Sequence, residues 1–114
     1  MEHTVQNKSF QFAVRTVKLC KYLREEQKEF IMTKQLLRSG TSIGANIAEA
    51  QQAQSKSDFV HKMSIALKEA SETHYWLRLL NATDYINDMA MESMISDCSE
   101  LEKLLTAIIR AAKE

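Results

Sequence analysis

The chain has 114 residues, no net formal charge, no proline and only two glycines. This length is enough for one domain with its own core, and the shortage of turn residues excludes most multi-stranded sheets. We therefore expect a single all-α domain over residues 1–114. A neutral chain also has no overall field that favours nucleic acid or a membrane surface.

The first predicted helix runs over about residues 8–27, with Phe10, Val14, Val17 and Cys20 or Lys21 at the helical spacing of a core face. A set of basic residues without intervening acids lies along it: Lys8, Arg15, Lys18, Lys21 and Arg24. The last four fan over half of the helix surface instead of forming a stripe. A solvated face is the simpler interpretation, and contact with nucleic-acid phosphates is the alternative.

The second predicted helix, over about residues 30–54, contains both glycines, Gly40 and Gly44. A glycine inside a helix costs roughly 1 kcal/mol relative to alanine, so these positions need a packing reason. Together with Ala48 they form a ladder of small residues four apart, which lets another backbone approach closely. Because apolar or small residues cover most of its circumference, we expect this helix to be buried on two sides.

Polar residues border the apolar surfaces of the second and third predicted helices. They are Arg38, Asn46, Glu49, Glu69 and Glu72. Charges in such a position are usually solvated. The alternative is that they pair across helices or subunits and fix the register of packing.

Two capping signals divide the second half of the chain. Ser55 opens the third predicted helix as the N-cap of a capping box, and Asn81 is predicted to end it as a C-cap just after Leu80. Asn87 or Asp88 opens the fourth helix. A heptad seam follows: Met91, Met94, Cys98, Leu101, Leu105, Ile108 and Ala112. Four helices with short connections and such seams predict an up-down-up-down bundle.

The third predicted helix also carries apolar residues away from its core line. They are Ile65, Trp76, Leu79 and Leu80. A contiguous patch of this kind usually marks an interface. With the small-residue face of Gly44 and Ala48, the chain offers two different faces that suit a head-to-tail contact between copies, and such contacts can close into rings.

Catalytic and metal-binding signals are absent from the sequence pattern. His61 and His74 belong to no HExxH or Glu-x-x-His pair, and we interpret His74 as a boundary histidine with one hydrogen bond. Cys20 and Cys98 are predicted to be buried thiols of a reducing compartment. We predict no catalytic, cofactor or metal residue. No apolar run is long enough to span a membrane and the first residues resemble no signal peptide, so we expect the cytoplasm.

The segment SIGANIAEA, with Gln35, Leu36 and Arg38 before it, resembles the signature of a family of bacterial four-helix-bundle proteins. This family includes the proteins encoded in intervening sequences of large-subunit ribosomal RNA genes. It is similar to the accessory variability determinant proteins of diversity-generating retroelements. The family pattern, approximately QLRRAxxSIPSNIAEG, has proline where this chain has Gly44 and glycine where it has Ala50. Looser matches follow at Phe59, Ile65, Ala66, Ser71 and Glu72.

The resemblance implies a left-handed bundle that forms homo-oligomers, with a pentameric ring as first choice and a dimer as second. The retroelement relatives bind nucleic acid and a reverse transcriptase through basic surfaces. The resemblance therefore implies the same class of partner for the alternative function given below. The function we expect is a non-catalytic, self-assembling scaffold or accessory module without a small-molecule substrate. The alternative is a nucleic-acid-binding accessory factor that uses the basic first helix.

Overall fold

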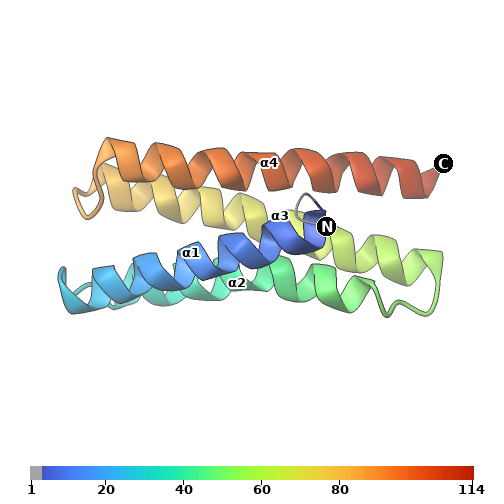
Figure 1. Cartoon of the computed structure of the whole chain (residues 1–114), viewed down its shortest axis with the longest axis horizontal. Helices are drawn as coiled ribbons and strands as arrows, with labels where there is room; N and C mark the ends of the chain where they lie inside the picture. Colours follow the sequence, from blue (N-terminus) through green and yellow to red (C-terminus); the bar gives the residue numbers. More distant parts are fainter. Residues whose placement is uncertain (1–3) are drawn as a thin grey trace.

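The chain folds into helices whose neighbours run antiparallel (Figure 1). The computed structural model describes residues 4–114. Over this range the helices are α1 (Val5–Glu25), α2 (Ile31–Ala50), α3 (Lys56–Ala82) and α4 (Asp88–Lys113). Each helix packs against the next one in the chain, and α4 also contacts α1. The predicted all-α, up-down-up-down bundle is confirmed.

The helices α1, α3 and α4 each begin next to a side chain that caps their first turn. Thr4, Ser55 and Asn87 each accept a hydrogen bond from the backbone amide three residues later. These bonds satisfy amides of the first turn that have no partner within the helix. The predicted N-caps at Ser55 and Asn87 are confirmed, whereas α1 begins at Val5, earlier than expected, and α2 ends at Ala50, earlier than expected.

The start of α2 is capped by a glutamate that the sequence analysis missed. Glu29 is only 7% exposed. Its carboxylate accepts hydrogen bonds from the amides of Ile31, Met32 and Thr33 and from the Thr33 hydroxyl, at 2.7 to 3.1 Å. Burial raises the pKa of Glu29, but these hydrogen bonds outweigh it and leave the pKa below its ordinary value. The ionised carboxylate is therefore the form that holds the helix start.

The tight turns use residues other than glycine. Lys28, between α1 and α2, has a φ of 54°, and Asp84, between α3 and α4, has a φ of 70°. The predicted C-cap at Asn81 is wrong, because α3 continues to Ala82. The side-chain amide of Asn81 instead donates to the Ile86 carbonyl and to the Asp88 carboxylate, bracing the α3–α4 turn.

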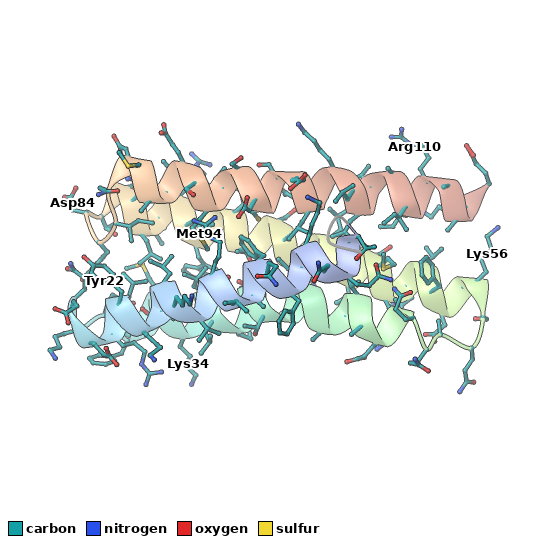
Figure 2. All side chains as sticks on the ribbon, in the orientation of Figure 1. Tyr22, Lys34, Lys56, Asp84, Met94 and Arg110 are labelled. Carbon is teal, nitrogen blue, oxygen red and sulfur yellow. The ribbon has the colours of Figure 1, made fainter. Side chains whose placement is uncertain are left out.

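The core runs along the bundle axis and includes the middle of the predicted α4 seam. Met94, Cys98, Leu101 and Leu105 are all buried. Figure 2 shows the Met94 side chain between the helices. The helices form a rod of 45 × 24 × 21 Å. Among the described residues, no helix is both long and apolar enough to cross a bilayer.

The predicted core face of α1 is wrong at Phe10 and Val17, although its member Cys20 is buried. Phe10 and Val17 are 63% and 41% exposed. The residues that α1 buries are Ser9, Phe12, Thr16, Cys20 and Leu23. Two of these are small and polar, so a search for apolar spacing does not select them. Their packing partners on α2 explain the choice.

Candidate interaction surfaces

The seam between α1 and α2 is built around the two glycines. A Cβ atom on Gly40 would lie 2.6 Å from Cγ2 of Thr16, and one on Gly44 would lie 3.3 Å from the backbone oxygen of Ser9. Real Cβ atoms essentially never approach as closely as the first distance. The missing side chains thus let α1 approach α2, and small Ser9 and Thr16 occupy the seam in place of the larger Phe10 and Val17.

A groove lies on the outer side of this seam. It has a volume of about 520 Å³. Its lining residues are Gln6, Ser9, Phe10, Ala13, Thr41, Gly44, Ala45, Ala48 and Gln51. Gly40 is buried and does not line the groove, whereas Ala48 lines it and is exposed. Most of the lining residues are small, and Phe10 adds exposed apolar surface, so the groove can accept an apolar side chain from another molecule.

A polar network joins α2 to α3 on the neighbouring side of the bundle. The Arg38 guanidinium lies 3.0 Å from the carboxylate of Glu69 and also pairs with Glu72. Glu72 accepts a further hydrogen bond from the Trp76 indole, at 2.9 Å. The Trp76 hydrogen bond and then Arg38 lower the pKa of Glu72. Arg38 thus holds two neighbouring carboxylates that would otherwise repel each other.

The other two polar candidates lie outside this network. Glu49 pairs with Lys62 at 2.9 Å, which is a second bridge from α2 to α3. Asn46 donates to the carbonyl and hydroxyl oxygens of Ser42, within its own helix. The structure therefore brings Arg38, Glu69 and Glu72 together and leaves Asn46 and Glu49 apart from them.

The predicted apolar patch on α3 is smaller than expected. Leu80 is fully buried, so its assignment to an exposed patch is wrong: its position on the helix still faces the core. Ile65, Trp76 and Leu79 are half-buried. Tyr75, which the sequence analysis did not select, is 56% exposed and packs edge-on against Trp76, with ring centroids 5.1 Å apart.

The basic residues of α1 divide into two groups. Lys8 and Arg15 point toward α4, where they pair with Glu100 at 3.2 Å and Asp97 at 2.5 Å. The second group is exposed and forms no ion pair with any residue of the 4–114 range: Lys18, Lys21 and Arg24. Another exposed basic residue, Lys34 of α2, lies at the same end of the bundle as Tyr22, which is a neighbour of Lys21 in the chain (Figure 2). The structure thus brings some basic residues to the turn between α1 and α2 but not all five.

Both thiols are free and buried, as predicted. Burial raises the pKa of Cys20 to about 11, and burial with nearby Glu102 and Asp97 raises that of Cys98 to about 12. His74 lies at the α3–α4 boundary with its Nδ1 3.3 Å from Glu102. A buried thiol that keeps its proton is a poor nucleophile.

Comparison with known proteins places this fold among relatives. The family described as 23S rRNA-intervening sequence protein matches residues 1–107. A solved structure from Bacteroides thetaiotaomicron, described as a protein with unknown function from the S23 ribosomal protein family, is 60% identical, with a TM-score of 0.92. The match covers 93% of this chain and 98% of that one. A comparison with curated proteins gives no match.

Proposed function

The chain belongs to the 23S rRNA-intervening sequence protein family, and on that premise we propose that it is a non-catalytic module that assembles with copies of itself and serves as a scaffold or accessory protein. The groove between α1 and α2 carries this proposal.

Two free cysteines fit a reducing compartment, so we place the protein in the cytoplasm.

The groove leaves apolar surface in contact with water that a second copy would cover. Phe10, which lines the groove, is 63% exposed, and Val17 is 41% exposed on the same helix. Burying apolar area gains about 25 cal/mol per Å², so the release of such side chains from water favours association. The formal net charge of zero leaves little long-range repulsion between copies.

The second contact surface that we propose lies around Trp76 on the adjacent side of the bundle. It combines Ile65, Trp76 and Leu79 with the exposed ring of Tyr75. A ridge on one copy and a groove on the next form a head-to-tail contact, which closes into a ring when the rotation between copies allows it. We propose a pentamer first and a dimer second, as the family resemblance implies.

The state of the two thiols supports a role without catalysis. Both have a raised pKa and lie inside the bundle. The groove is lined by small residues, Phe10, two amides and the hydroxyls of Ser9 and Thr41, with no charged or imidazole side chain among them to activate a hydroxyl. These features suit a surface for packing better than a site for a reaction.

Nucleic-acid binding is the second candidate function. The observation that favours it is that Lys18, Lys21 and Arg24 are exposed and form no ion pair with any of residues 4–114. In an oligomer these groups from several copies would add up to a larger positive field, and concentrated positive charge is what gives affinity for phosphates. In a single copy, the nearby Glu25 and Glu26 reduce this field.

The molecular mass in solution tests the main proposal. We expect light scattering at low micromolar concentration to give a multiple of the 13.1 kDa chain mass. A mass of one chain over the whole accessible concentration range would contradict self-assembly.

A further inference from the structure

A group of three potential metal ligands lies between α3 and α4, on the side of the bundle opposite the α1–α2 groove. His74 comes from α3, and Cys98 and Glu102 come from α4. One ligand atom from each residue lies within 4.8 Å of the other two. Within residues 4–114 these are the residues that meet this criterion.

The helices fix the positions of the three side chains. Cys98 and Glu102 are four residues apart, so they lie on the same face of α4, one turn from each other. His74 faces them from α3, with its Nδ1 3.3 Å from a Glu102 oxygen. Metal sites in helical bundles are built in this way, from side chains on facing helices.

The burial of the three groups gives the site an inside and an opening. The Cys98 residue is 0% exposed and its thiol donates to the Ala70 carbonyl at 3.2 Å. The side chains of His74 and Glu102 are 32% and 25% exposed. An ion can therefore enter past the imidazole and the carboxylate and reach the sulfur beneath them.

We propose that His74, Cys98 and Glu102 bind a divalent transition-metal ion of the zinc class, with water in the remaining position. Imidazole nitrogen, thiolate sulfur and carboxylate oxygen are the three ligand types that zinc uses in proteins. Calcium and magnesium prefer oxygen ligands and would leave the sulfur and nitrogen unused. Three protein ligands also leave one position of a tetrahedral site open.

Binding requires a small local change and the loss of a proton. Zinc bonds are about 2.0 to 2.3 Å long, so the ligand atoms must draw closer than they are now. His74 and Glu102 are partly exposed and can rotate to do this without moving the helices. The thiol of Cys98 must give its proton to solvent as the metal–sulfur bond forms, because only the thiolate is a ligand.

Cobalt(II) titration of the reduced, full-length protein tests the site. Thiolate coordination gives a charge-transfer band in the near ultraviolet, and a four-coordinate ion gives strong visible bands. We expect both, and we expect zinc to remove them by displacement. Cys98→Ala should abolish the ultraviolet band. Cys20→Ala is the matched control, since it removes a buried thiol that belongs to no such group in the described chain, and it should keep the band.

A second variant covers the case in which Cys98→Ala does not fold. His74→Gln changes a partly exposed residue and should leave the bundle intact, yet weaken cobalt binding by at least about tenfold, since loss of even a supporting partner has that effect. Zinc should raise the melting temperature of the original protein more than that of this variant. The proposal is overturned if no thiolate band forms, or if the band and affinity are unchanged in Cys98→Ala or His74→Gln.

Discussion

Gly40 of α2 lies directly against Thr16 of α1, with no room for a side chain between them. A methyl group on Gly40 would lie 2.6 Å from Cγ2 and 2.9 Å from Oγ1 of Thr16. Thr16 is buried, and its hydroxyl is held by a hydrogen bond to the Phe12 carbonyl, so it has little room to move. The need for glycine therefore comes from the neighbouring helix.

We predict that Gly40→Ala destabilises the protein even though alanine is the better helix former. The gain in helix propensity is roughly 1 kcal/mol, and overpacking of a tight contact costs about 1–3 kcal/mol. Urea unfolding should show a net loss of stability. Gly44→Ala is the control and should lose less, because its nearest contact is 3.3 Å. Adding Thr16→Ala to Gly40→Ala should recover stability, and a Gly40→Ala protein more stable than the original would contradict this packing.

The seam also explains which parts of the fold the sequence could predict. The α4 seam is visible because Met94, Cys98 and Leu101 alternate with polar residues at heptad spacing. The α1 core face is hidden because it depends on Thr16 matching Gly40, a fit between two helices that no single-helix periodicity contains. The capping role of Glu29 has a local signal, since its carboxylate is within reach of the first amides of α2.

The candidate sites also differ in whether one helix alone reveals them or whether they depend on how two helices meet. Arg38 could be selected because a charge beside an apolar strip is visible in one helix, but its pairing with Glu69 and Glu72 depends on how α2 meets α3. The group of His74 and Cys98 joins residues 24 positions apart. Spacing rules for metal sites describe ligands within one helix or loop, so they miss a pair that meets only across the bundle.

Glu29→Gln should remove part of the acid sensitivity of the protein. The folded-state pKa of Glu29 is lowered, so its stabilising effect is present at pH values above the ordinary glutamate pKa and is lost as the pH falls through the folded-state value. We expect a loss of about 0.5–2 kcal/mol at neutral pH, as for other helix caps. Below the folded-state pKa the two proteins should converge in urea unfolding. Equal losses at neutral and acid pH would contradict a role for the charge.

Trp76 fluorescence should report the protonation of Glu72. Trp76 is the only tryptophan in the chain, and its indole donates to Glu72, whose pKa is lowered by this bond and by Arg38. We expect an emission change at a pH below the ordinary glutamate pKa, absent in Glu72→Gln. Arg38→Met should move the change to higher pH, since it removes a positive charge. Its effect on stability should be at most about 1 kcal/mol, because the pair is partly solvated. An unchanged midpoint in Arg38→Met would rule out the coupling.

Nucleic-acid binding should be weak and should depend on the unpaired basic group. We expect a Kd no tighter than about micromolar at physiological salt, weakening steeply as salt is added. Replacing Lys18, Lys21 and Arg24 together by glutamine should weaken binding further. Replacing Lys8 and Arg15 is the matched control, because both are already paired with carboxylates of α4. Nanomolar, salt-tolerant binding to one sequence would instead promote nucleic-acid recognition to the main function.

Phe10→Glu should shift the assembly toward single chains without unfolding the bundle. Phe10 is 63% exposed and lines the α1–α2 groove, so a carboxylate there costs little within one chain but opposes burial against a second copy. Ile31→Glu is the control, since Ile31 is more exposed, at 81%, and lies outside the groove. Trp76→Ala should act in the same direction as Phe10→Glu, but loss of the bond to Glu72 makes it a less direct probe. Light scattering gives the mass and circular dichroism the helix content. If both variants keep the same multiple of the chain mass as the original protein, the groove is not the contact between copies. If only Phe10→Glu dissociates and its helix content is unchanged, the contact lies at the α1–α2 groove.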